Sequence, residues 1–96
     1  MTFVRRLNSA KENGRLTTTD LSIWFERPYH TVRGWLEGKE PWGVYAEDVS
    51  RHLDILEKLI AKRNGFPVPA VLSPSDRRKH MKKARHERVL SERERA

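Results

Sequence analysis

Three prolines within nine residues place the strongest constraint on the fold of this 96-residue chain. They lie in the stretch FPVPAVLSP, residues 66–74. Proline lacks a backbone N–H, clashes with the preceding helical turn and disfavours helical backbone at the residue before it. No helix can run through this stretch, so we expect an all-α protein in three parts. These are a small helical bundle over residues 1–66, a Pro-rich connector over 67–74 and a basic helix or tail over 75–96.

Apolar residues at helical spacing predict two short helices at the N-terminus. The first covers residues 3–12 and is followed by Gly14, which we expect in the left-handed conformation common just after a helix. The second begins at Thr17, whose hydroxyl is a candidate N-cap. Asp20, three residues later, completes a capping box in which Asp replaces the usual Glu or Gln.

Two further helices are predicted before the connector. Pro28 is favoured at a helix start because its missing N–H would have no partner there, and Gly38 marks the end of this third helix. The fourth covers residues 44–65 and has a wide apolar stripe, which we expect to close the core. The stripe consists of Tyr45, Val49, Leu53, Ile55, Leu56, Leu59 and Ile60. An alternative is that the seam at Leu56 and Ile60 pairs with a second copy.

The charge of the chain indicates a polyanionic partner. Lys and Arg number 20 against 13 Asp and Glu, a net charge of +7 with a pI near 10.3, and nucleic acid is the leading candidate. The chain has no cysteine, which removes disulfides and thiolate metal sites. The N-terminal residues lack the apolar run of a signal peptide, and no stretch approaches the ~18 apolar residues of a membrane span. We therefore expect a cytoplasmic protein without a membrane contact.

Catalytic patterns are weak in this sequence. His80 and His86 lie six residues apart and would face different directions on a helix, which makes them a poor metal pair. Asp48 and His52 share a helix face, and we expect them to form a surface pair. No glycine-rich phosphate loop is present. We expect no enzymatic activity, no cofactor, no metal and no small-molecule substrate.

The stretch LTTTDLSIWFERPYHTVRGWLEG, residues 16–38, carries the strongest functional signal. It resembles the helix-turn-helix domains of the phage-repressor and Xre-like family, and it aligns with their pattern without a gap. The pattern runs Leu-Thr, Leu with a small residue, a turn, Thr with a hydrophobe, Trp and Gly. The matching positions are Leu16, Thr17, Leu21, Ser22, Thr31, Val32, Trp35 and Gly38. Three positions depart from it: Glu26 replaces the turn glycine, Arg27 the following hydrophobe and Pro28 the polar N-cap.

The resemblance implies that the second helix of the unit enters the major groove of double-stranded DNA. Carried over position by position, the base-contacting candidates are Tyr29, His30, Arg33 and Gly34. The phosphate-contacting candidates are Arg15, Thr17, Thr18, Arg27, Thr31 and Lys39. Each assignment has a structural alternative, because Thr17 is also the predicted cap and a polar helix face is often merely solvated. Trp24, Phe25 and Trp35 follow the inward stripes, so we expect them in the core.

The C-terminal segment adds a second basic region. Its candidates for sequence-independent phosphate contact are Arg77, Arg78, Lys79, Lys82, Lys83 and Arg85. One alternative is a solvated, partly frayed helix. Another is that Met81, Ala84 and Val89 pack on the core or on a second subunit.

The sequence thus predicts sequence-specific binding of double-stranded DNA, as by a small transcriptional regulator in the bacterial nucleoid or a phage-infected cell. The alternative is an assembly or adaptor protein that recruits DNA, such as a phage terminase small subunit, with the C-terminal segment binding a partner. A homodimer or higher homo-oligomer is plausible in both cases, because a single half-site gives weak specificity. RNA binding ranks last, since single-stranded RNA readers expose aromatics that are expected to be buried here.

Overall fold

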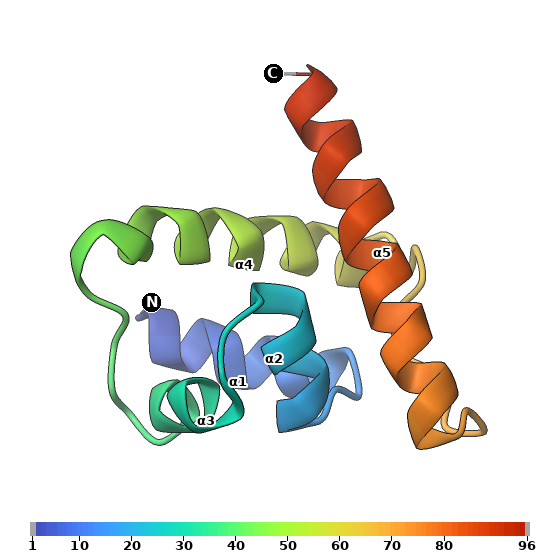
Figure 1. Ribbon diagram of the computed structural model, residues 1–96, viewed down its shortest axis with the longest axis horizontal. Coiled ribbons are helices and arrows are strands. Elements are labelled where there is room, and N and C mark those ends of the chain that lie inside the picture. The colour runs from blue at the N-terminus through green and yellow to red at the C-terminus, as the bar shows by residue number, and fades with distance from the viewer. Residues whose placement is uncertain (1, 96) are drawn as a thin grey trace.

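A computed structural model describes the backbone of residues 2–95 and the side chains of residues 2–87. This part of the chain is all-helical, as predicted (Figure 1). The elements are α1 (Phe3–Asn13), α2 (Thr18–Phe25), α3 (Tyr29–Leu36), the 3₁₀ turn η1 (Gly43–Tyr45), α4 (Ala46–Ala61) and α5 (Pro74–Arg95).

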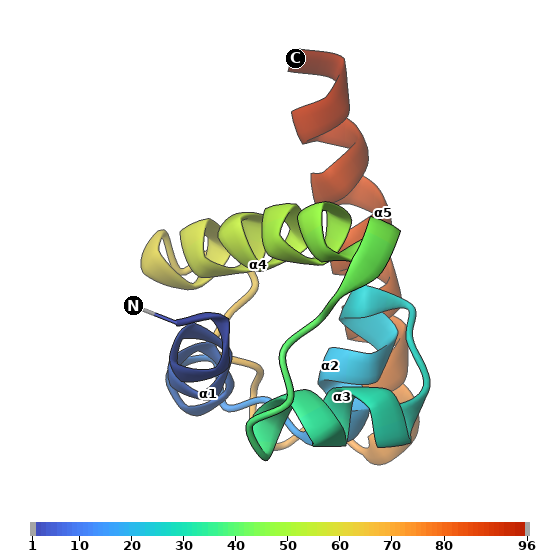
Figure 2. The same cartoon turned by 90° about the vertical axis from the view of Figure 1, so that its left-hand side faces the viewer.

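The helices form a small bundle around α2. Helix α4 lies across one side of α1 and α2, and α3 lies beyond α2 on the other side (Figures 1 and 2). Helix α5 packs against α2 and α4, and its last turns extend past α4 (Figure 1). Because α2 contacts α3, α4 and α5, its eight residues are covered on most sides.

The start of α2 confirms the predicted capping box. The Thr17 hydroxyl accepts a hydrogen bond from the backbone N–H of Asp20 at 3.1 Å, and the Asp20 carboxylate accepts one from the Thr17 N–H at 2.9 Å. Two helix-end donors that would otherwise lack partners are satisfied in this way.

The prediction for Gly14 was wrong. Its φ of −88° is right-handed, and the left-handed residue is its neighbour Arg15, with φ +52°. Gly14 is needed for space instead. A Cβ there would lie 3.0 Å from the Ala10 carbonyl oxygen and 3.1 Å from Cδ1 of Ile60, because the end of α1 packs closely on α4.

The fourth helix is shorter than predicted, and one member of its stripe was assigned wrongly. It ends at Ala61, and Arg63 then adopts φ +54° ahead of Gly65 at φ +88°. Tyr45 lies in η1 and is exposed, since the 3₁₀ turn shifts it out of register with the helix. The rest of the stripe closes the core as expected. Leu56 is fully buried within its own chain, so it is not available to the alternative seam between two copies.

The core does not end at residue 66, contrary to the expected division of the chain. Phe66, Val68 and Met81 are all buried. The Phe66 ring meets Trp24 edge-on with centroids 6.3 Å apart, and the Val68 N–H donates to the Gly14 carbonyl at 3.0 Å. The Pro-rich segment and the first half of α5 are therefore one packing unit with α1–α4.

We expect Met81→Ala to lower the free energy of unfolding by about 2 to 5 kcal/mol, because Met81 is 0% exposed and the substitution leaves a cavity. Met81→Leu conserves volume and should cost less than about 1.5 kcal/mol. Urea denaturation followed by circular dichroism measures both. Equal stability of Met81→Ala and the exposed-site control Lys79→Ala would show that α5 is not part of the core.

Candidate nucleic-acid interface

The connection between α2 and α3 is a turn of three residues, which gives the predicted helix-turn-helix connectivity. Glu26 adopts the left-handed conformation, with φ 53° and ψ 47°, at the position where the resembled family has glycine. The N–H of Glu26 donates to the Ile23 carbonyl at 3.3 Å and that of Arg27 to the Ser22 carbonyl at 3.1 Å, so two carbonyls of the last turn of α2 are satisfied. A left-handed non-glycine residue costs roughly 1 to 2 kcal/mol. Glu26 therefore adopts the left-handed conformation at an energetic cost.

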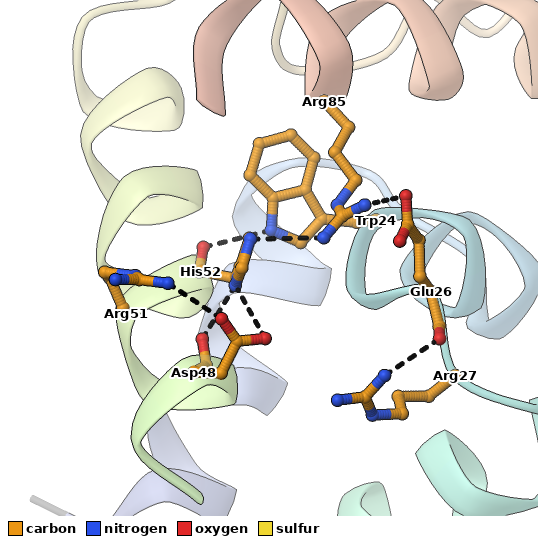
Figure 3. Close-up of polar contacts among 7 residues, drawn as sticks. All are labelled: Trp24, Glu26, Arg27, Asp48, Arg51, His52 and Arg85. Atoms are coloured by element: carbon orange, nitrogen blue, oxygen red, sulfur yellow. Dashed lines mark hydrogen bonds and ion pairs between the residues drawn. The ribbon is translucent and has the colours of Figure 1, made fainter. Parts of the chain in front are cut away.

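Arg85 of α5 contacts the turn between α2 and α3. Its guanidinium forms an ion pair with the Glu26 carboxylate, and its Nη2 lies 3.1 Å from Nε2 of His52 on α4 (Figure 3). One side chain thus links the turn, α4 and α5.

His52 pairs with Asp48 as expected, with its Nδ1 3.5 Å from the Asp48 carboxylate. The imidazole is buried rather than on the surface, because α2 and α5 cover this side of α4. Its Nδ1 donates to the Asp48 carbonyl oxygen at 2.7 Å, which leaves the Nε2 lone pair to accept from Arg85 (Figure 3). The His52 carbonyl in turn accepts from Nε1 of Trp24 at 3.0 Å. Both ring nitrogens and the backbone of His52 are therefore satisfied, as a buried imidazole requires.

Helix α3 has the two faces expected from its sequence. Val32 and Trp35 are buried, whereas His30 and Arg33 are exposed and Tyr29 is half exposed. The Trp35 ring makes T-shaped contacts with Phe3 and Phe25, with centroid distances of 5.7 and 5.5 Å. These contacts fix the rotation of α3 about its axis, and hence which side chains face outward.

Gly34 lies at the border of the exposed face, and it is half-buried beside Lys39. Its carbonyl accepts from the Lys39 N–H at 2.9 Å, which closes the end of α3. A Cβ at Gly34 would meet only Cδ of Lys39, at 3.4 Å. The space for a methyl group is therefore present in the free protein.

The phosphate candidates of the helix-turn-helix differ in availability. Arg15 and Lys39 are exposed, and Thr18 and Thr31 are half-buried. The Thr17 hydroxyl caps α2, which confirms the capping role. The guanidinium of Arg27 stacks over the Tyr45 ring at 4.8 Å and donates to the Glu26 carbonyl.

The basic residues of α5 separate into inward and outward groups. Arg77 pairs with the buried carboxylate of Asp20 and donates to the Arg15 carbonyl at 2.9 Å. Arg77 and Arg85 therefore hold the fold, and the expectation that both contact phosphate overlooked these partners. Four of the tail candidates are exposed, namely Arg78, Lys79, Lys82 and Lys83. We call these four the basic stripe.

Two apolar members of the segment pack inward, as one of the sequence alternatives held. Met81 is in the core and Ala84 packs against it. The side chain of Val89 lies outside the described residues.

Sequence reasoning missed an apolar groove beside α3. It has a volume of about 650 Å³ and lies between the α2–α3 turn and the loop that leads to α4. Its apolar lining is formed by Pro28, Trp35, Pro41, Trp42, Val44 and Tyr45, and we call it the aromatic groove. The sequence feature that could have indicated this groove is Trp42 in the loop KEPWG, because no helix stripe accounts for an aromatic residue there.

Comparisons with protein-family models, curated proteins and solved structures found no match. Among the described residues, no three His, Cys, Asp or Glu side chains are grouped to hold a metal ion. Within the same part of the chain, no helix has the length and apolar character needed to cross a membrane.

We expect Arg85→Met to lower the free energy of unfolding by about 1 to 3 kcal/mol, because it leaves the buried Nε2 of His52 without its donor. Lys82→Met makes the same change at an exposed site of α5 and should leave stability unchanged. Thermal and urea denaturation of the two variants test this. If both are as stable as the wild type, Arg85 does not hold the turn.

Proposed function

We propose that this protein binds double-stranded DNA sequence-specifically, as a small transcriptional regulator, with α3 in the major groove. The proposal rests on the division of α3 into a buried and an exposed face. Val32 and Trp35 anchor one side in the core, while His30 and Arg33 are free to reach a duplex. The net charge of +7 supplies attraction to phosphate.

The exposed side chains of α3 suit base edges. The Arg33 guanidinium can donate to both acceptors of a guanine in the major groove. His30 can bind a purine N7, and Tyr29 can contact a phosphate or a thymine methyl group. Arg33 lies 3.6 Å from Glu37 in an exposed i,i+4 pair, and such a pair is weak enough to yield to a better partner.

The charges around α3 limit how the duplex lies. Arg15 and Lys39 flank the unit as exposed cations, and Thr18 lies in the first turn of α2, where free backbone N–H groups favour phosphate. Glu37 is exposed at the C-terminal end of α3, where its carboxylate repels the phosphate backbone of the DNA. We therefore infer that only the first two turns of α3 approach the bases.

A DNA-recruiting adaptor, such as a phage terminase small subunit, is the alternative function. The basic stripe of α5 favours it, since four exposed cations bind phosphates without reading sequence. Selection of bound sequences from a random duplex pool separates the two functions. A sharp motif supports the regulator, and a diffuse one supports the adaptor.

Arg33→Ala should weaken binding to the best selected duplex by roughly 10- to 100-fold and relax specificity at one base pair, because a bidentate guanine contact is worth about 1 to 3 kcal/mol. Arg51→Ala is the matched control. Its side chain is 60% exposed against 61% for Arg33, and it too has an acidic neighbour on its own helix.

Fluorescence anisotropy with the selected duplex and single-base variants of it measures both effects. Equal losses for Arg33→Ala and Arg51→Ala would contradict base readout by α3. They would leave a charge effect as the only explanation.

The double variant Lys82→Gln/Lys83→Gln should lower affinity to a similar degree for all duplex sequences. It should also reduce the slope of log affinity against log salt by roughly one to two, because each lost phosphate contact removes about 0.9. Titrations at several salt concentrations measure the slope. An unchanged slope would mean that the basic stripe does not contact the duplex.

A further inference from the structure

Apart from Tyr29 on α3, the exposed large apolar side chains of the described residues lie at two sites. Trp42, Val44 and Tyr45 lie at the aromatic groove. Val71 stands apart from them, in the segment between α4 and α5, and is 91% exposed. Large contiguous apolar patches are rare on the surface of soluble monomers, and they commonly mark interaction sites.

The aromatic groove is built to receive a small apolar group. Trp35 lines it with a side chain that is fixed in the core, and Trp42 stands in the loop with 85% of its surface exposed. On the Tyr45 side, the Arg27 guanidinium covers the ring at 4.8 Å. The groove thus has a fixed aromatic wall, a free aromatic wall and a charged side.

Val71 sits at the tip of a tight turn formed by residues 69–72, which we call the connector turn. The Leu72 N–H donates to the Pro69 carbonyl at 3.3 Å. Val68 is buried on one side of the turn, and Leu72 packs against the core on the other. The turn is therefore held at both ends and presents Val71 without a large loss of chain entropy on binding.

The connector turn and the aromatic groove lie at opposite ends of the molecule. In Figure 1 the loop before α4 is at the left end of the longest axis, and the segment before α5 is at the right end. The molecule extends 34 Å along this axis. A connector turn therefore cannot reach the groove of its own chain.

The charges of the two ends are complementary. Residues 37–48, which include the loop side of the groove, hold four carboxylates and one lysine, a formal net charge of −3. Two of these carboxylates, Glu37 and Asp48, pair with Arg33 and Arg51. Residues 62–73, which include the connector turn, hold Lys62 and Arg63 and no acidic residue, a net charge of +2. Because carboxylates outnumber Lys39 on the loop side of the groove, this side favours a basic partner such as the connector segment.

We propose that the connector turn of one copy inserts Val71 into the aromatic groove of the next copy. The contact is heterologous, because the two surfaces differ, and each copy keeps one of each for a further neighbour. Such contacts build rings when the rotation between copies closes and open chains when it does not. A four-residue turn buries far less than the ~800 Å² per partner of a stable interface, so the association is weak and depends on concentration.

Analytical ultracentrifugation of the full chain without DNA tests the proposal, from about 10 μM to about 1 mM. The mean mass of the wild type should rise with concentration. Trp42→Ala and Val71→Glu should each weaken association by about tenfold or more. Both sites are exposed, so the variants should melt like the wild type. Ser9→Glu, at an exposed site of α1, adds the same charge and should associate normally.

Mixing the two variants decides whether the contact is head-to-tail. Trp42→Ala keeps its connector turn and Val71→Glu keeps its groove, so an equimolar mixture has one intact interface. It should form a species of two chains and nothing larger.

Three outcomes overturn the proposal. One is a wild type that stays monomeric over the whole range. Another is loss of association in Trp42→Ala but not in Val71→Glu, which would indicate groove-to-groove pairing. The last is a mixture that stays monomeric although the wild type associates. None of these results depends on DNA binding, so the proposed function stands or falls separately.

Discussion

The packing of α5 against α2 is the interaction on which the rest of the structure depends. A helix of eight residues is not stable alone in water, so α2 needs neighbours on several sides. Trp24 is fully buried among them, with its indole N–H on the His52 carbonyl and its ring against Phe66. Met81 fills the core from α5. Without α5, Trp24 and Asp20 would face water on one side, and the capped start of α2 would lose its outer cover.

Two inward arginines fix how α5 sits on α2. The Arg77–Asp20 pair is buried, whereas Glu26 in the Arg85–Glu26 pair is exposed. Neither kind of ion pair contributes much net stability, but the geometry of both is specific. Arg77 meets Asp20 at the start of α2, and Arg85 meets Glu26 at its end. Because both ends are fixed, α5 cannot rotate freely about its axis. The basic stripe is therefore held on the outward face.

Local signals predicted the first 60 residues well. The capping box of Thr17 and Asp20 depends on residues three apart, and the two faces of α3 follow from helical periodicity alone. The role of Gly14 was harder to predict, because it depends on close packing against Ile60 from another helix. Tyr45 was misassigned because a separate 3₁₀ turn, η1, precedes α4, and the residues give no clear signal for it.

The C-terminal half could not be predicted in the same way. Arg77, Met81 and Ala84 do have helical spacing, but in a segment so rich in cations an inward arginine looks like an outward one. Its partner Asp20 lies 57 residues away in sequence. The pairing of His52 with Asp48 was predicted, but its burial was not, because Arg85 contacts it from α5. The aromatic groove also needs two segments, the α2–α3 turn and the loop before α4, which only the tertiary fold brings together.

The left-handed Glu26 connects these features to the candidate interface. Glycine would adopt its conformation without strain, yet glycine has no carboxylate to meet Arg85. The left-handed turn thus has an attachment to α5 that glycine could not make. The orientation of α3 then depends on α5 as well as on α2, although α3 lies on the far side of α2 (Figure 1). In the proposed complex, a change in how α5 packs would reach the DNA-contacting face through this single residue.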